Sequence, residues 1–210
     1  MALVARRAEP LRDVVESIRA RGGTAHALVA DVADKQAMYP LAAAAAELVG
    51  PIDLLVHNAS ELGPTPLRPL LDTACEDLER VLAVNLIGPF RLTKAIAGAM
   101  ALGRAGTVVH ISSDAAVNAY ANWGVYSVSK AALDHLTRIL AVELEPHGVR
   151  VFSVDPGDMN TDLHAAAVPG ADVSELADPD VVAARIAGMI ASPRVRSGQR
   201  LEAATWNGAS

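Results

Sequence analysis

The chain has 210 residues, 51% of them hydrophobic and 20% charged, and a formal net charge of −6 at pH 7. This composition is typical of a globular protein with a sizeable core and excludes extended disorder. The negative charge argues against nucleic acid as a partner, because neutralising phosphates requires a basic face. A single cysteine excludes an intrachain disulfide, and no apolar stretch reaches the roughly 20 uninterrupted residues of a membrane helix. Because no secretory signal follows Met1, we expect a cytoplasmic protein without membrane contact.

Short apolar runs alternate with longer helical patterns, which predicts an α/β fold: a Rossmann-like, doubly wound parallel sheet with helices on both faces. The expected strands lie near 2–5, 25–30, 52–57, 107–111, 149–154 and 199–203. Apolar residues recur every three to four positions in the expected helices, 8–21, 36–49, 76–101, 124–145 and 178–192. Pro89 falls inside the third helical pattern and is expected to bend or break it. Since no linker or repeat divides the chain, residues 1–210 are expected to form a single domain.

Three residues carry the strongest chemical signal. Tyr126 and Lys130 have the i, i+4 spacing of helix neighbours, so the ammonium is expected to lie near the phenol and favour its ionised form. An ordinary tyrosine has a pKa of about 10, and a lower pKa would turn the phenol into an acid/base at neutral pH. Ser113, thirteen residues before Tyr126, is placed to hold a substrate oxygen. The pattern predicts a reductase active site.

Polar or turn-forming residues follow five of the expected strands. In open parallel sheets, ligands bind beyond the carboxyl ends of the strands. Any one of these residues alone is more simply an ordinary polar loop residue, but together with Tyr126 and Lys130 they favour a ligand site. The residues are Arg6 and Arg7, Asp31, Asn58, Ser112 and Ser113, and Asp155 to Gly157. The six histidines show no metal-ligand spacing, so no metal is expected.

With these motifs in order, the chain resembles the classical short-chain dehydrogenase/reductase family over nearly all of its length. The family's Asn-Asn-Ala-Gly stretch reads His57-Asn58-Ala59-Ser60 here, with histidine and serine as local departures. The remaining matches are the helix asparagine Asn85, the serine Ser113, the Tyr-x-x-x-Lys pair Tyr126 and Lys130, and the turn Pro156-Gly157 with Thr161.

The resemblance implies an NAD(P)-dependent oxidoreductase that interconverts a carbonyl and a secondary alcohol by hydride transfer. Tyr126 would be the general acid/base, and Lys130 would lower its pKa and bind the nicotinamide ribose. Ser113 would donate to the substrate oxygen, and Asn85 would hold a water that relays protons to Lys130. The family also suggests a homodimer or homotetramer built from the helices near 76–101 and 124–145.

The cofactor expected is NADP(H) rather than NAD(H). The position that would carry an acidic residue for the ribose 2′-hydroxyl reads Val4-Ala5-Arg6-Arg7, without a carboxylate. An arginine guanidinium can bind a 2′-phosphate with two hydrogen bonds. The alternative without a functional role is a pair of solvent-exposed arginines at the start of a helix. The other expected cofactor contacts are Asp31 and Val32 at the adenine, Asn58 and Ala59 beside the adenosine ribose, and Pro156, Gly157 and Thr161.

One family feature has no counterpart in the sequence. The family opens with a central strand and a Gly-x-x-x-Gly-x-Gly turn, where backbone amides at a helix N-terminus meet the cofactor pyrophosphate. The early glycines Gly22 and Gly23 instead follow a helix and precede a strand. We therefore expect that the first strand is missing and that the chain is N-terminally truncated.

Loss of that strand would remove hydrogen-bond partners from the first and third strands seen here. There are three possibilities: the first and third strands pair directly with each other, the missing strand belongs to the native protein but not to this sequence, or the fragment is unstable. The 210-residue chain alone is accordingly expected to bind NADPH poorly. A non-catalytic scaffold is the alternative function, and a Rossmann-like methyltransferase has little support because its cofactor loop also needs the absent strand.

Overall fold

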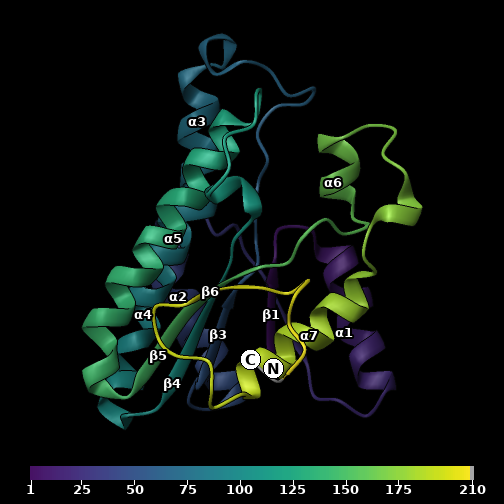
Figure 1. The fold of residues 1–210 in the computed structure, drawn as a ribbon. Helices are drawn as coiled ribbons and strands as arrows, with labels where there is room; N and C mark the ends of the chain where they lie inside the picture. The colour runs from purple at the N-terminus through teal and green to yellow at the C-terminus, as the bar shows by residue number, and fades with distance from the viewer. Residues whose placement is uncertain (209–210) are drawn as a thin grey trace.

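The computed structural model describes residues 1–208 and contains six strands, all paired in parallel. Each lies within two residues of its predicted position, which confirms the α/β architecture (Figure 1). The strands are β1 (Ala2–Ala5), β2 (His26–Val29), β3 (Leu54–His57), β4 (Gly106–Ile111), β5 (Val149–Asp155) and β6 (Arg200–Glu202).

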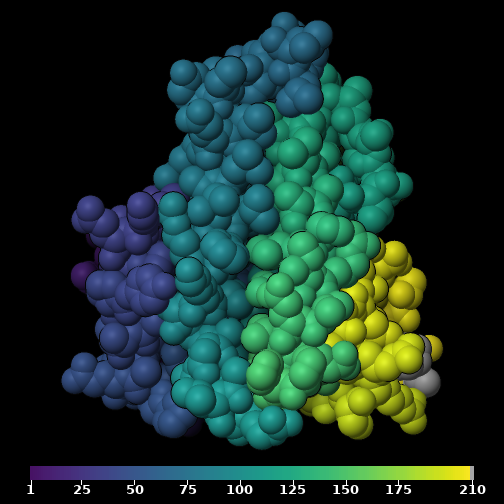
Figure 2. Space-filling view, turned by 90° about the vertical axis from the view of Figure 1, so that its left-hand side faces the viewer, coloured from purple at the N-terminus to yellow at the C-terminus, as the bar shows by residue number. Residues whose placement is uncertain are grey.

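Helices cover both faces of the strands. The helices are α1 (Ala8–Ala20), α2 (Met38–Val49), α3 (Cys75–Leu82), α4 (Gly88–Gly103), α5 (Gly124–Leu144), α6 (Asp162–Ala167) and α7 (Pro179–Ala191). The first core cluster packs α2, α4 and α5 on β3, β4 and β5, and Figure 2 looks onto this face, where α4 and α5 lie side by side. The second cluster packs α7 on β4 and β5, and α1 lies on the same side as α7 (Figure 1). The short α6, in the loop over 158–177, was not expected.

The strands form two sheets rather than one. Strand β1 pairs with β2, and a separate sheet has the order β3-β4-β5-β6, so β1 and β3 do not close up. On β3, Leu54 and Val56 are 40% and 41% exposed, which is unusual for apolar side chains in a parallel sheet. Val4 and Leu28 still pack against the first core cluster, so side chains join the small sheet to the large one.

Of the bend or break expected at Pro89, the break does not occur. Helix α3 continues through a π-helical turn, η2 (Ala83–Ile87), into α4, where Pro89 lies in the first turn. A wider turn accommodates the missing N–H and the proline ring without ending the helix. Among the described residues, only the run Cys75–Gly103 is long and apolar enough to cross a membrane, by length and composition alone. Half of its most apolar window is buried, as in core helices.

Candidate active site

Tyr126 and Lys130 lie in the first two turns of α5 and are 7% and 2% exposed. The Lys130 ammonium lies 5.5 Å from the centroid of the Tyr126 ring. Its Nζ donates a hydrogen bond of 2.8 Å to the carbonyl of Ile111, at the end of β4. The i, i+4 spacing therefore brings the pair together, and the bond to Ile111 fixes the lysine against the sheet.

The expected lowering of the Tyr126 pKa does not occur in this structure. Burial raises the pKa of the Tyr126 phenol, although hydrogen bonds with the Ser60 and Ser113 hydroxyls act in the opposite direction. Burial also lowers the pKa of Lys130 to about 8, while Asp134 acts upward. Because the ammonium is aimed at Ile111 and is itself desolvated, it does not offset the burial of the phenol. Tyr126 is therefore protonated at neutral pH.

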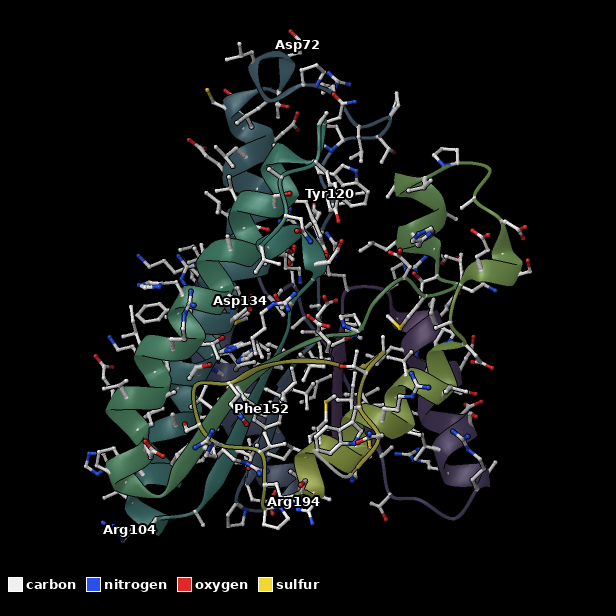
Figure 3. All side chains as sticks on the ribbon, viewed as in Figure 1. Asp72, Arg104, Tyr120, Asp134, Phe152 and Arg194 are labelled. Carbon is white, nitrogen blue, oxygen red and sulfur yellow. The ribbon has the colours of Figure 1, made fainter. Side chains whose placement is uncertain are left out.

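Ser113 follows β4 and is held by its neighbours. Its hydroxyl donates to Asp114 Oδ1 at 3.0 Å and accepts from the N–H of Ala115 at 3.2 Å. Tyr120 donates to the other Asp114 oxygen at 2.7 Å, and Figure 3 labels Tyr120 in the loop between β4 and α5. Asp114 thus orients both hydroxyls, a role for which the sequence offers no periodic signal because these residues lie in a loop and in the single 3-10 turn Asp114–Ala116.

Ser60 is the site residue that the sequence reasoning missed. It stands where the family usually has glycine, and its hydroxyl interacts with the Tyr126 phenol. The same hydroxyl donates to Asn85 Oδ1 at 3.4 Å. The departure from the family pattern was the available signal, because a serine in the loop after β3 adds a hydroxyl that can form hydrogen bonds in the site.

Asn85 is buried in η2, and its amide is fully engaged by protein groups. The amide oxygen accepts from the N–H of Glu61 at 2.8 Å, and the amide nitrogen donates to the Glu61 carbonyl at 2.8 Å and to Ser129 at 2.9 Å. With the Ser60 contact, this accounts for its two donors and two acceptor sites. The Asn85 side chain therefore clamps the loop after β3 to α5. The role of Asn85 in holding a water that relays protons to Lys130 stays a prediction.

The ends of β3 and β5 present the other expected contacts. Asn58 and Ala59 are exposed directly after β3. After β5, Gly157 has a φ of +75°, which favours glycine, and its N–H donates to Asp155 at 3.0 Å. Thr161 caps α6 by accepting from the N–H of His164 at 3.3 Å. The Pro156-Gly157 turn therefore projects from the same sheet edge as Ser113.

A second group of charged residues lies at the ends of β1 and β2. Arg80 contacts Asp31 at 3.1 Å and Glu61 at 3.2 Å, and Arg6 contacts the same Glu61 oxygen at 3.4 Å. Partial burial acts upward on the pKa of Asp31, but hydrogen bonds from the Ala33 N–H and Arg80 hold it below its ordinary value. Asp31 and Arg6 are thus linked through Glu61 and Arg80, and Arg7 is exposed beside them.

Val32 lies against the start of α4. A Cβ placed on Gly88 would approach the Val32 carbonyl oxygen to 2.5 Å, so only glycine allows this close approach. The start of α4, directly after the η2 turn, therefore holds in place the loop that contains Asp31 and Val32.

His57 and His110 form a buried stacked pair, with ring centroids 4.9 Å apart. His57 bonds to Thr93 at 2.8 Å and His110 bonds to Thr137 at 2.9 Å. Burial lowers both pKa values, that of His110 to about 3, so both rings are neutral. Among the described residues, no group of three or more His, Cys, Asp or Glu side chains is arranged to hold a metal.

The site fits one end of a nicotinamide dinucleotide. Tyr126, Lys130 and Ser113 converge at the sheet edge, and nothing lies within 4 Å of a Cβ built on Gly157, so the turn beside them is open to a ligand. Residues 1–208 contain no glycine-rich turn between a strand and a helix N-terminus that faces the gap between β1 and β3. Within residues 1–208, the groups expected at the nicotinamide therefore lie together, whereas a turn of the kind expected at the pyrophosphate is not among the described elements.

Comparisons with known proteins agree with this geometry. The family model for short chain dehydrogenase matches residues 1–171. A short chain dehydrogenase of Pseudocercospora fijiensis is 32% identical over 206 residues, 97% of this chain and 64% of the relative. A structure of a 7 alpha-hydroxysteroid dehydrogenase, complexed with NADH and 7-oxo glycochenodeoxycholic acid, has a TM-score of 0.86 and 30% identity. That alignment covers 96% of this chain and 81% of the other.

A short chain dehydrogenase structure from Shigella flexneri, complexed with NADP, has a TM-score of 0.84 and 26% identity. It covers 97% of this chain and 85% of the other. The chain spans between 56% and 64% of the length of the first curated relatives that it matches. The extent of the family match, together with the order of the motifs and the fold, establishes that the chain belongs to the short-chain dehydrogenase family.

Proposed function

We propose that the chain carries the catalytic residues of an NAD(P)-dependent oxidoreductase that interconverts a carbonyl and a secondary alcohol. One observation supports this most directly: the buried Tyr126 phenol lies among the Ser60 and Ser113 hydroxyls and the Lys130 side chain. A protonated phenol at a sheet edge, with hydroxyl donors beside it, is suited to transfer a proton to a developing alkoxide.

Each residue has a defined part in this proposal. A bound nicotinamide would supply or accept the hydride. Tyr126 gives its proton to the carbonyl oxygen during reduction and takes one from the alcohol during oxidation. The Ser113 hydroxyl, whose one proton goes to Asp114 in this structure, would turn that proton to the same oxygen when a substrate binds. The Lys130 ammonium, 5.5 Å from the centroid of the Tyr126 ring, attracts the phenolate left behind, but too weakly to offset the rise in the phenol pKa that burial causes. Because burial raises the pKa of Tyr126, reduction is favoured at neutral pH and oxidation at higher pH.

The substrate would enter beside Tyr126. A small pocket there is bordered largely by apolar side chains, and Trp123 packs edge-on against Tyr126 with ring centroids 5.9 Å apart. We propose a small molecule with an apolar flank next to its carbonyl. The pocket residues include Leu62, Leu67, Arg68, Trp123, Val125 and Tyr126.

NADP(H) is the proposed cofactor. Its support is Arg6, whose side chain is 53% exposed at the end of β1 and whose nearby carboxylate, Glu61, is shared with Arg80. A 2′-phosphate would compete with Glu61 for the Arg6 guanidinium. The related structures were solved with NADP in one case and NADH in another, so the family accommodates both.

We further propose a homodimer or homotetramer that uses α4 and α5. These helices lie side by side on one face (Figure 2), and Phe90, Ile139 and Val142 on them are 43%, 44% and 75% exposed. Exposed apolar side chains on adjacent helices are typical of an association surface.

The test is turnover by the chain and by its Tyr126→Phe variant, with millimolar NADPH and a panel of ketones and aldehydes. The proposal predicts that Tyr126→Phe lowers kcat by about 10²- to 10⁴-fold, because it removes the transferred proton. The control is Tyr39→Phe, since Tyr39 is an exposed tyrosine on α2 and should leave kcat unchanged. Equal, negligible turnover by the chain and Tyr126→Phe would favour the non-catalytic scaffold instead.

A further inference from the structure

Arg200, on β6, connects segments that are far apart in the sequence. Its Nη2 donates to the Ser113 carbonyl oxygen and to Asp155 Oδ2, both at 2.9 Å. Its Nε donates to Asp134 Oδ2 at 3.1 Å, and Nη1 donates to Glu202 at 3.4 Å. One guanidinium therefore contacts the loop after β4, the end of β5 and the middle of α5.

Three of the four residues that Arg200 contacts belong to, or lie close to, the candidate catalytic and cofactor-binding residues. Asp134 is one helical turn after Lys130, and Figure 3 labels it on α5. Asp155 accepts the N–H of Gly157 through its second oxygen, so fixing this carboxylate also fixes the turn after β5. The Ser113 carbonyl belongs to the residue whose hydroxyl faces Tyr126.

The charges make Arg200 hard to replace. The side chains of Asp134 and Asp155 are 8% and 9% exposed, and that of Arg200 is 21% exposed. Two nearly buried carboxylates beside one another repel and lose hydration, so the structure requires a cation between them. A planar guanidinium reaches both carboxylates and the carbonyl at once, whereas a lysine ammonium has no such fork.

We propose that Arg200 is a positioning residue that holds Ser113, the Lys130 helix and the Pro156-Gly157 turn in one catalytic arrangement. It touches none of the reacting atoms and acts through Ser113, Asp134 and Asp155. The inference rests on the proposed function for its kinetic consequence, but its structural consequence is independent of that function. No such role follows from sequence spacing, because Arg200 and Ser113 are 87 residues apart.

The kinetic test compares Arg200→Met and Arg200→Lys with a matched control, Arg185→Met. Arg185, on α7, also donates to backbone carbonyls near the C-terminus, those of Ala203 and Ala204, but contacts neither carboxylate. Arg200→Met is expected to lower kcat by about 10- to 100-fold with a smaller change in KM, because the reacting groups lose their alignment. Arg200→Lys should recover part of kcat, and Arg185→Met should stay within about twofold of the parent. Parental kcat in Arg200→Met would overturn the proposal.

The second test needs no turnover and therefore separates this inference from the proposed function. Hydrogen–deuterium exchange should become about tenfold faster across residues 112–118 and 155–161 in Arg200→Met, and remain unchanged there in Arg185→Met. Several backbone N–H groups in these segments are bonded in the parent, including those of Ala116 and Gly157, so lost protection is measurable. Parental exchange in both segments would overturn the proposal even if the chain reduces no carbonyl.

A third variant covers the case in which Arg200→Met does not fold. The triple variant Asp134→Asn, Asp155→Asn, Arg200→Met removes the buried charges together, so that no carboxylate is left without a cation. It should melt close to the parental temperature and still exchange rapidly across 112–118, because the Ser113 carbonyl has lost the Arg200 donor and keeps only the Ala116 N–H. A folded triple variant with parental exchange in that segment would contradict the proposal.

Discussion

The sheet of β3 to β6 and the pair of β1 and β2 differ in how many of their strands have a hydrogen-bonded neighbour on both sides. In the larger sheet, β4 and β5 are each flanked by strands on both sides, and the candidate catalytic residues are fixed by bonds at its carboxyl edge. The smaller pair joins the rest through side-chain packing and through Glu61, which contacts Arg6 with its carboxylate and Asn85 with its backbone. The candidate catalytic residues therefore lie in the more fully paired region, while the residues expected at the adenine lie on the strand pair that is joined to the rest by side chains.

Of the variants that test how the two regions are joined, Asn85→Ala is expected to have the largest effect. This change removes the amide that clamps the loop after β3, and it leaves the Glu61 N–H and carbonyl without that partner. We expect the free energy of unfolding to fall by about 2–4 kcal/mol. Chemical denaturation checks this, with the exposed Asn160→Ala as control. A loss below about 0.5 kcal/mol would show that the clamp does not join the two regions.

Lys130→Met tests how much the buried charge of Lys130 lowers the stability of the folded protein. Because burial lowers the pKa of Lys130 to about 8, the charged side chain destabilises the folded state most below pH 8. We expect this variant to gain roughly 1–2 kcal/mol of stability at pH 7, after deduction of the lost bond to Ile111, and to lose activity.

The gain should shrink between about pH 8 and pH 10.5. In that range the folded parent releases the Lys130 proton while the unfolded chain keeps it, so parental stability rises with pH. Denaturation at pH 7 and pH 9.5 provides the measurement, with the exposed Lys94→Met as control. An equal gain in stability at pH 7 and pH 9.5 would show that the buried charge of Lys130 is not its cause.

Arg6→Asp tests whether Arg6 selects NADPH over NADH, and it is expected to have the smallest effect of these variants. Reversing the charge beside a 2′-phosphate should lower the preference for NADPH over NADH by about five- to tenfold in kcat/KM. Arg12→Asp makes the same charge change at an exposed position on α1 and serves as the control. An unchanged ratio for Arg6→Asp would exclude Arg6 from cofactor selection.

The sequence predicts the strands and most helices because their periodicity is local. It does not predict the continuous helix at Pro89, because a π-helical turn depends on how the preceding residues pack. The i, i+4 spacing places Lys130 beside Tyr126 but does not reveal that burial dominates the pKa of the phenol. Contacts between distant segments, such as that of Arg200 with Ser113, leave no periodic pattern.

The most direct measurement is a fluorescence titration of the 210-residue chain with NADPH. The described residues assemble Ser113, Tyr126 and Lys130 at the nicotinamide end but offer no glycine-rich turn of backbone N–H groups for the pyrophosphate. We therefore predict a Kd weaker than about 100 μM, a binding free energy of less than about 5.5 kcal/mol in magnitude. A Kd of a few micromolar would contradict the account, because it would require a phosphate-binding surface other than the glycine-rich turn that residues 1–208 lack.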